Sequence, residues 1–303
     1  MGWRSLYLSN LNQLKLSLIN NQLLVTKNDS KLTVKISDID VIVADTYNFT
    51  ISGSVIAKLS ENHIALIVTS PKTHLPTSLM INPYTENRLR GKVALAQIKA
   101  DEKFLFQCWK RFLIAKIEGQ KSIVNQNYNY KQIDKTDDLA TILGVEGSWG
   151  KIYWRRMLGE DFNRSGKYDI EDGDTINAFL NYSYAVIRAR VASAICEYGM
   201  IPSLGLFHSG LQNPFALADD LIEPYRWVVE KRLVENLEEI VSQNELTPNL
   251  KKIAILTLRE KVKIENRGVF ELSDAIAVGA QSLQRAFLEK NIDGLGNLIC
   301  RQN

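Results

Sequence analysis

The hydrophobic pattern of this 303-residue chain changes its period once, and that change limits the possible folds more than any other feature. Up to about residue 80, apolar and polar residues alternate in three short runs: 3–8, 14–18 and 32–36. A period of two, rich in β-branched and aromatic residues, predicts half-buried strands. Denser apolar runs at 39–43 and 64–68 predict more deeply buried strands. Asn20 and Asn21 predict a turn, and 52–59 predicts one short helix.

From about residue 87, apolar residues recur at every fourth position, as in Phe104, Cys108 and Phe112. Such rows are typical of helices that bury one face. The same reasoning predicts further helices at 136–160, 174–199, 214–238, 247–263 and 272–288. We therefore predict an α+β chain. A small N-terminal β domain of packed sheets (1–83) precedes a larger all-α C-terminal domain (84–303).

The composition excludes several classes of protein. No apolar run reaches the roughly 18 residues of a membrane-spanning helix, and no signal segment opens the chain. The three cysteines, Cys108, Cys196 and Cys300, are far apart and lack the CxxC spacing of zinc sites. A disulfide scaffold or a structural zinc site is therefore not expected. We expect a cytoplasmic protein that does not contact membranes.

Charge is divided unevenly along the chain. Residues 1–135 carry 18 basic and 10 acidic side chains, whereas residues 136–303 carry 19 and 24. A basic first half favours a polyanionic partner, because Lys and Arg release the counterions condensed on nucleic acid. Within it, the stretch 84–135 is predicted to form part of a duplex-holding surface. Its candidate DNA contacts are Lys92, Lys99, Lys103, Lys110 and Arg111.

Three features of the second half are candidates for chemistry. Glu146 lies between Gly144 and Gly147 and precedes an amphipathic run. It is either a carboxylate that the helix dipole favours near a helix start, or a metal ligand or general base at that position. His208 follows an apolar, glycine-containing segment just before a predicted helix. It is either a structural histidine or a ligand presented from a fixed backbone.

The third candidate is the acidic segment after residue 212. A helix start is predicted at 213–214, with Asn as the N-cap and Pro at the first helical position. Spacing of three residues then places Asp220, Glu223 and Arg226 along one side. Pro224 should kink the helix just after Glu223. The alternative is a solvated acidic face with a simple Glu223–Arg226 pair.

Two carboxylates and one imidazole that converged would bind a divalent cation. Oxygen ligands suit Mg²⁺, and an added nitrogen makes Mn²⁺ suitable as well. Such an ion polarises a phosphoryl oxygen and activates an attacking hydroxyl or water. The spacing along the chain does not by itself bring Glu146 to the other two residues.

Four blocks occur in the chain in a specific order. They are Glu146-Gly147, Asp174 to Tyr184, Gly205 to His208, and Leu217 to Arg226. This series resembles the CRISPR adaptation integrase family (Cas-one), and the opening Gly2-Trp3-Arg4 resembles its type II members. Two departures, Ser183 in place of a common glycine and the extra acid Asp219, remove no ligand.

The resemblance implies a fold, a reaction and a set of partners. The β domain would serve in dimerisation and contact with DNA ends, and two homodimers would flank a dimer of the smaller partner Cas-two. The 3′-hydroxyls of a short spacer duplex would attack the CRISPR repeat by transesterification. Accessory and effector proteins of type II systems are further implied partners. The matching metal positions are Glu146, His208 and Glu223, with Asp220 as a further acid near the Mg²⁺ or Mn²⁺ ion.

Three arginines, Arg226, Arg155 and Arg156, are further candidates, because they could neutralise phosphates near that ion. Two other functions remain open at this point. One is a hydrolytic, metal-dependent nuclease that acts on branched or single-stranded DNA. The other is a DNA-binding scaffold without catalysis.

Overall fold

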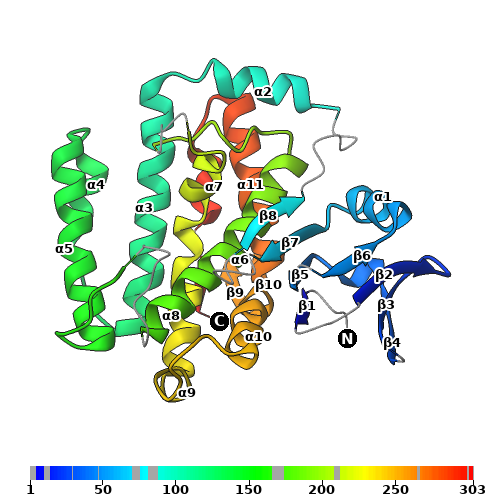
Figure 1. The fold of residues 1–303 in the computed structure, drawn as a ribbon. Coiled ribbons are helices and arrows are strands. Elements are labelled where there is room, and N and C mark those ends of the chain that lie inside the picture. The colour runs from blue at the N-terminus through cyan, green and yellow to red at the C-terminus, as the bar shows by residue number, and fades with distance from the viewer. Residues whose placement is uncertain are drawn as a thin grey trace.

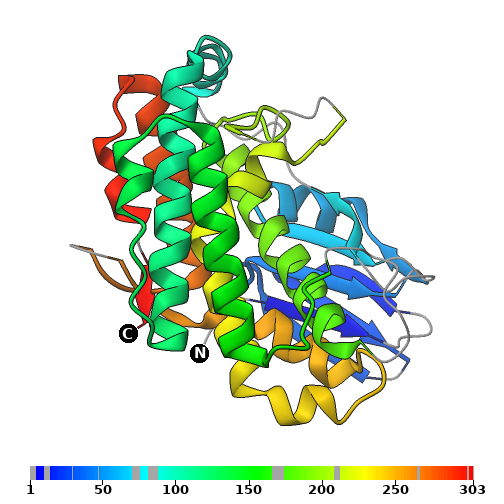
Figure 2. The ribbon, with the colours of Figure 1, turned by 90° about the vertical axis from the view of Figure 1, so that its left-hand side faces the viewer.

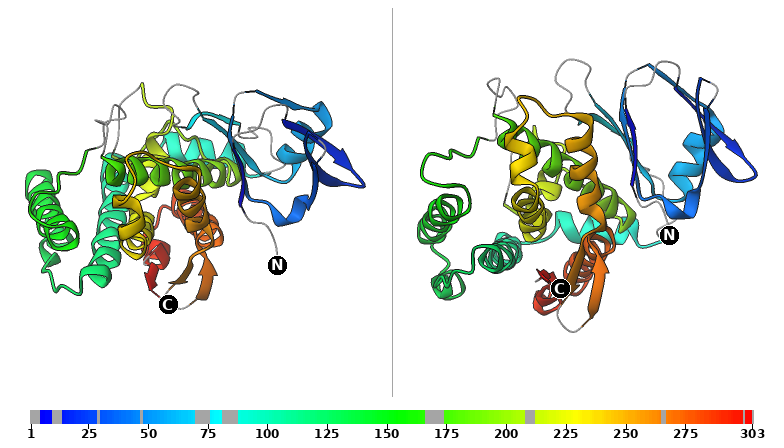
Figure 3. Two further views of the ribbon diagram at one scale, coloured as in Figure 1. Left: turned by 60° about the horizontal axis from the view of Figure 1, so that its bottom comes forward. Right: turned by 90° about the horizontal axis from the view of Figure 1, so that it is seen from below.

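The computed structural model describes residues 5–9, 14–28, 30–46, 48–69, 76–80, 88–165, 174–207, 212–264, 267–298 and 300–302. A β part comes first in the chain and lies beside a larger, mostly helical part (Figures 1 and 3). The predicted order of the two parts is therefore confirmed. The predicted boundary falls on residues 81–87, which lie outside the described residues. No described helix combines the length and apolarity needed to cross a bilayer.

The β part contains two four-stranded sheets, where the sequence predicted packed sheets without their strand number. The first sheet has the order β1 (Ser5–Ser9), β5 (Val41–Asp45), β7 (Ala65–Thr69) and β8 (Pro76–Met80). The second has the order β4 (Ser30–Lys35), β3 (Gln22–Lys27), β2 (Leu14–Ile19) and β6 (Phe49–Ile51). In the first, β1, β5 and β7 are parallel and β8 is antiparallel to β7. In the second, β2, β3 and β4 are antiparallel, and β6 runs parallel to β2.

Local sequence explains the turn and the helix of this part. Asn20 and Asn21 both have positive φ (49° and 60°), which a two-residue hairpin between β2 and β3 requires. The predicted short helix is α1 (Gly53–Glu61), and Ser52 caps it by accepting a hydrogen bond from the Val55 N–H. A short 3₁₀ turn, η1 (Ile36–Asp38), leads into β5.

The β part has two apolar faces with different partners. Leu16, Leu23 and Ile42 belong to a core between the sheets and α1. Val43 and Ile67, on the opposite face of the first sheet, join the large core of the helical part. The two parts are therefore packed together through a continuous apolar core.

The helical part is built around helix α6. Its elements are α2 (Arg90–Ile98), α3 (Glu102–Val124), α4 (Lys131–Lys135), α5 (Leu139–Leu158), α6 (Thr175–Glu197), α7 (Ala216–Leu221), η2 (Glu223–Tyr225), α8 (Arg226–Glu235), α9 (Leu237–Val241), α10 (Pro248–Leu256), η3 (Thr257–Arg259), α11 (Leu272–Glu289) and η4 (Asp293–Leu298). Helix α6 is buried along almost its whole length. Helices α3 and α5 run side by side at the edge of the bundle (Figure 2).

The three long helices α3, α5 and α6 share one start signal. Asp101, Asp138 and Asp174 precede them, and each side chain accepts a hydrogen bond from a backbone N–H of the first turn. Aspartate is among the preferred N-cap residues because its carboxylate satisfies a donor that has no partner within the helix. Glu146 therefore lies about two turns inside α5, not at its start as the sequence interpretation suggested.

The helical part also contains a small sheet that the sequence pattern did not predict. Strands β10 (Gly268–Glu271), β9 (Lys261–Ile264) and β11 (Cys300–Gln302) form it in that order. The helix predicted at 247–263 was wrong beyond Leu256, because 261–264 alternates exposed lysines with buried Val262 and Ile264. A period of two favours a strand over a helix.

The acidic segment differs from the prediction at its start and agrees with it at the kink. Helix α7 begins at Ala216 rather than at Pro214, because Asn213 forms a local turn and accepts a hydrogen bond from the Phe215 N–H at 3.0 Å. The α-helix is interrupted at η2, where Pro224 cannot donate a backbone hydrogen bond. The break predicted at this proline is present, but the α-helix already ends at Leu221, before Glu223.

The contact between α3 and α8 allows a test of the packing. A Cβ atom added to Gly119 of α3 would overlap the buried indole of Trp227, whose Nε1 is 2.7 Å from that position. Gly119→Ala should therefore lower the free energy of unfolding by about 3 kcal/mol. Gly144→Ala in α5 is the control: nothing lies within 4 Å of its Cβ position, and it should stabilise by up to about 1 kcal/mol. Urea unfolding measures both; equal effects would contradict this packing.

Candidate active site

Two of the three predicted metal ligands meet on the ammonium group of Lys116. Its Nζ lies 2.7 Å from Glu146 Oε1 and 2.8 Å from Glu223 Oε2. The three residues come from α3, α5 and η2, which are distant in the sequence. Their side chains are 17%, 28% and 10% exposed, so the cluster lies at the edge of the interior. The structure thus brings Glu146 and Glu223 together, as the sequence resemblance implied.

Glu223 is held as a carboxylate by two cations. Arg226 Nε donates a hydrogen bond to Glu223 Oε1 at 2.8 Å, and Lys116 contacts the other oxygen. Burial alone would raise the pKa of Glu223, but Arg226 and Lys116 outweigh it and lower the pKa to about 2. Burial alone would lower the pKa of Lys116, but Glu223 and Glu146 outweigh it and raise the pKa. Both groups are therefore charged over the whole neutral range.

A second, fully buried carboxylate fixes the helices around this cluster. Glu230 of α8 accepts hydrogen bonds from Tyr153 and Tyr184 (2.7 Å each) and from Gln120 Nε2 (3.0 and 3.1 Å). Trp149 Nε1 donates to Gln120 Oε1 at 2.8 Å. These bonds connect α3, α5, α6 and α8. They fix the rotation of α5 and, with it, the direction of Glu146.

The structure gives Asp220 a role in holding the chain. It is fully buried, and its Oδ2 accepts hydrogen bonds from the backbone N–H groups of Leu206 (2.6 Å) and Phe207 (3.2 Å). The Phe207 ring stacks on Trp109 at a centroid distance of 4.1 Å. The backbone that leads into His208 is therefore fixed. His208 itself lies outside the described residues.

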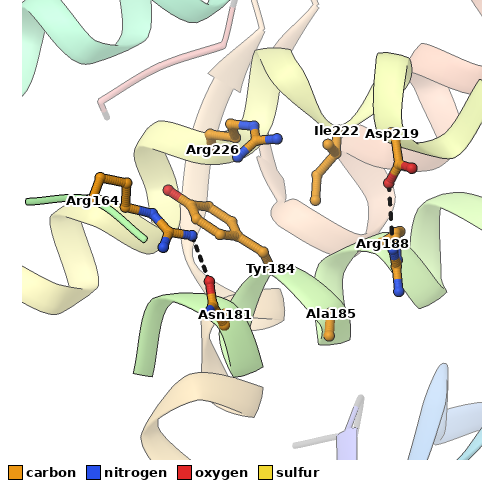
Figure 4. Close-up of a pocket in the computed structure, with 8 residues that line it drawn as sticks. All are labelled: Arg164, Asn181, Tyr184, Ala185, Arg188, Asp219, Ile222 and Arg226. Carbon is orange, nitrogen blue, oxygen red and sulfur yellow. Dashed lines mark hydrogen bonds and ion pairs between the residues drawn. The ribbon is translucent and has the colours of Figure 1, made fainter. Parts of the chain in front are cut away.

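Next to Glu223 lies a pocket of about 170 Å³ with three arginines in its lining, Arg164, Arg188 and Arg226 (Figure 4). The guanidinium carbons of Arg226 and Arg164 lie 4.8 and 5.5 Å from the ring centre of Tyr184. Arg188 faces Asp219, with Nη1 3.5 Å from Oδ1. The lining thus carries three positive charges and one negative charge. Such a pocket favours an anion of phosphate size.

The other predicted DNA contacts lie elsewhere. Arg155 and Arg156 are on the exposed side of α5, and Arg155 pairs with Glu160. Lys92, Lys99, Lys103 and Arg111 are exposed on or next to α2 and α3. They stay candidates for a duplex surface. Lys103 is about 20 Å from Lys116 along the axis of α3.

Lys110 does not belong to that exposed surface, which corrects the sequence interpretation. It is 3% exposed, and its Nζ donates to the Thr136 carbonyl at 2.6 Å and to Asp137 Oδ1 at 3.2 Å. Lys110 therefore anchors the segment between α4 and α5 to helix α3. The sequence shows a basic residue on a predicted helix in either case, so it does not distinguish a buried lysine of this kind from a solvated one.

The donor set around Lys116 suits a cation. Two carboxylate oxygens from separate helices converge on one positive charge, which is the arrangement that a divalent ion with oxygen ligands also needs. Within the described residues, no three Asp, Glu, His or Cys side chains are placed to hold a metal. The predicted third ligand, His208, follows directly on the backbone that Asp220 fixes.

Comparison with known proteins identifies the family. The model of the family "CRISPR associated protein Cas1" matches residues 7–249. The chain is 33% identical over 297 residues to the CRISPR-associated endonuclease Cas1 of Neisseria meningitidis serogroup C (strain 8013), with 96% of this chain and 94% of the relative covered. This chain belongs to the Cas1 family. A Cas1 of Francisella tularensis subsp. novicida is 26% identical over 205 residues, which cover 55% of this chain and 64% of that protein.

Solved structures with the same fold include a casposase bound to its integration product. It has a TM-score of 0.79 and 21% identity, with 95% of this chain and 91% of the casposase covered. The Cas1 protein TM1797 of Thermotoga maritima has a TM-score of 0.69 and 14% identity, covering 94% and 96%. A Cas6-RT-Cas1–Cas2 complex has a TM-score of 0.70 and 16% identity, covering 96% and 35%. The Cas1 fold is therefore shared across these proteins.

Sequence reasoning about this Cas1 chain missed Lys116, Gln120 and Glu230. A signal for two of them exists: Lys116 and Gln120 continue the buried row that runs through Cys108 and Phe112 at intervals of four residues. Polar side chains on the apolar side of a helix need partners. For Glu230 no such signal stands out, because its donors come from three other helices.

The lowered pKa of Glu223 predicts a loss of stability in acid. Because the folded-state pKa (about 2) is below the usual 4.5, this group stabilises the fold above pH 4.5, and the contribution is lost as the pH falls towards 2. At pH 7, Glu223→Gln should lower the free energy of unfolding by on the order of 3 kcal/mol. At pH 3 the difference from wild type should shrink by more than half. Urea unfolding at both pH values tests this; a constant difference would contradict it.

Proposed function

We propose that this Cas1-family protein is a metal-dependent DNA integrase of CRISPR adaptation. It joins the 3′-hydroxyl ends of short spacer DNA to the CRISPR repeat by transesterification. The observation that carries the proposal is the convergence of Glu146 and Glu223 on one cation, beside a pocket lined by three arginines. A site with paired carboxylates and an adjoining positive pocket suits a phosphodiester that must be held and polarised at the same time.

Glu146, Glu223 and His208 would hold the Mg²⁺ or Mn²⁺ ion. When bound, it supplies Lewis-acid polarisation of a phosphoryl oxygen and activation of the attacking hydroxyl. Asp220 fixes the backbone before His208, and Glu230 fixes the helix of Glu146. Both act as positioning residues.

The arginines of the pocket would bind the DNA backbone. Arg226 is oriented by its hydrogen bond to Glu223, and Arg164 by a 2.6 Å hydrogen bond from its Nη2 to Asn181. Arg188 projects into the same space (Figure 4). Side chains that are already oriented lose less freedom when they bind a phosphate. They would keep the scissile phosphate next to the carboxylates.

In the proposed reaction one phosphodiester replaces another. The spacer 3′-oxygen forms a bond to the repeat phosphorus as its proton leaves, and the bond from that phosphorus to the repeat 3′-oxygen breaks, with that oxygen taking up a proton. A second joining on the opposite strand completes the insertion. The number of phosphodiester bonds does not change, so the reaction requires no external energy source. In the hydrolytic alternative, water takes the place of the spacer hydroxyl at the same site.

The proposed partners are spacer and repeat DNA, a second copy of this chain and Cas2. Relatives support this assignment: one structure of the same fold is titled a casposase bound to integration product, and another a Cas6-RT-Cas1–Cas2 complex. We propose that two homodimers flank a Cas2 dimer, and that type II accessory and effector proteins join this assembly.

Removing any proposed ligand should abolish strand transfer. Glu146→Ala, His208→Ala and Glu223→Ala should each lower joining at least about 100-fold, because a metal that stabilises the transition state is worth several kcal/mol. DNA binding should stay measurable. The assay mixes the purified protein with and without Cas2, a labelled spacer duplex, a supercoiled repeat-bearing plasmid and Mg²⁺ or Mn²⁺.

Glu238→Ala, which removes an exposed carboxylate of α9, is the matched control. Full joining by any of the three ligand variants would refute the site. Shortened products in place of joined ones would favour the hydrolytic nuclease. Activities that all survive a chelator would favour the scaffold.

The arginine pocket gives a second test of this function. Arg188→Gln should weaken DNA binding and reduce the slope of log K against log salt by about 1, because one phosphate contact is lost. Arg285→Gln is the control, because Arg285 is an exposed arginine of α11 that pairs with Glu289 and is not among the candidate DNA contacts; it should change the slope less. Binding titrations over a range of salt concentrations measure both slopes. Equal slopes for Arg188→Gln and wild type would reject the pocket.

A further inference from the structure

Lys116 occupies the position at which the two carboxylates converge. It lies beyond the midpoint of α3, and its Nζ contacts Glu146 Oε1 from α5 and Glu223 Oε2 from η2. The 2.7 Å contact is a charge-assisted hydrogen bond from Lys116 to Glu146, and the 2.8 Å contact with Glu223 is an ion pair. The ammonium therefore lies between the two carboxylates.

An ammonium and a divalent ion cannot both occupy this position. Mg²⁺ and Mn²⁺ bind carboxylate oxygens at roughly 2.0–2.2 Å, so an ion that shares these oxygens would approach the Lys116 nitrogen very closely. The cluster now holds two carboxylates and two cations, Lys116 and Arg226. Adding an ion without moving Lys116 would leave an excess of two positive charges in a partly buried space.

Lys116 has both the means and the room to move away. Its four-carbon stem is flexible, unlike the planar, hydrogen-bonded fork of Arg226. A cavity of about 330 Å³ adjoins the cluster, and Lys116 and Glu146 are part of its lining. Gly147 and Gly150 also line it, and nothing lies within 4 Å of where their Cβ atoms would be.

We propose that Lys116 is a tethered cation that keeps Glu146 and Glu223 together in the metal-free protein and is displaced when the divalent ion binds. The proposal rests on the metal site of the proposed function and adds a competitor to it. The positive charge of Lys116 offsets the repulsion between the two carboxylates before the ion binds. The same contact lowers the affinity of the free protein for the ion.

The test measures metal binding without DNA. Lys116→Met removes the charge and keeps most of the stem, and it should bind Mn²⁺ at least about 10-fold more tightly than wild type in calorimetric titration. Lys116→Gln, a second neutral variant, should behave alike, and Lys116→Arg, which keeps the charge, should not gain affinity. Lys121→Met is the matched control, since Lys121 lies on the same helix and pairs with Glu118 rather than with the carboxylate pair.

Thermal unfolding gives a second readout. In a chelator, Lys116→Met should unfold at a lower temperature than wild type, because the carboxylates repel each other, and Mn²⁺ should raise its midpoint by more than that of wild type. A double variant with Lys116→Met and Glu223→Gln should lose the tight Mn²⁺ binding, which would place the ion at Glu223. Neutral variants that bind Mn²⁺ no more tightly than wild type would overturn the role of Lys116 and leave the integrase proposal standing. If neither the wild type nor any variant bound Mn²⁺, both the role of Lys116 and the metal-dependent integrase proposal would be rejected.

Discussion

Two carboxylates can share a partly buried space only when positive charge lies between them, and the helical part of this protein is arranged around that constraint. Glu146 and Glu223 come from segments far apart in the sequence, and Lys116 and Arg226 balance their charges. Removing one member of such a group would leave an uncompensated charge, which costs far more than the pair gains. The cluster is therefore stable as a unit and specific for a cation at its centre.

The cluster depends in turn on a neighbouring hydrogen-bond network, in which neutral side chains donate to one charged carboxylate. Glu230 collects hydrogen bonds from Gln120, Tyr153 and Tyr184, so that a completely buried carboxylate is satisfied by donors from three helices. Such networks specify one arrangement of helices, because any rotation leaves a donor or the carboxylate unpaired. The positions of Glu146 and Glu223 are thus set by residues that do not contact them.

The site places opposite charges on its two sides. On one side the carboxylates favour a metal ion, and on the other Arg164, Arg188 and Arg226 favour a phosphate (Figure 4). Glu223 belongs to both sides, because it receives the hydrogen bond of Arg226 and contacts Lys116. A shared residue of this kind would couple the binding of a phosphate to the geometry of the proposed metal ligands. This arrangement would suit the proposed strand transfer, which needs both charges close to one phosphorus atom.

The sequence by itself determined those features that are fixed by near neighbours. Strands β1, β2 and β4 follow from alternation and β5 and β7 from denser apolar runs, whereas β3, β6 and β8 were not predicted. The Asn20–Asn21 turn follows from the tolerance of asparagine for positive φ, and the break at Pro224 from its missing N–H. Four ordered blocks were enough to indicate the family and its carboxylates. Beyond Leu256 the helix prediction was wrong, because the period-two alternation at 261–264 was interpreted as a continuation of the preceding helix.

Only the tertiary structure decided which charges meet. Lys110 and Lys116 look alike in the sequence, yet one anchors a connecting segment and the other holds the two carboxylates. Asp220, a candidate ligand, accepts hydrogen bonds through its Oδ2 from the backbone before His208. The physical reason is that hydrophobic periodicity depends on spacing along one helix, whereas an ion pair between helices depends on how they are rotated and packed against each other, which no single segment encodes.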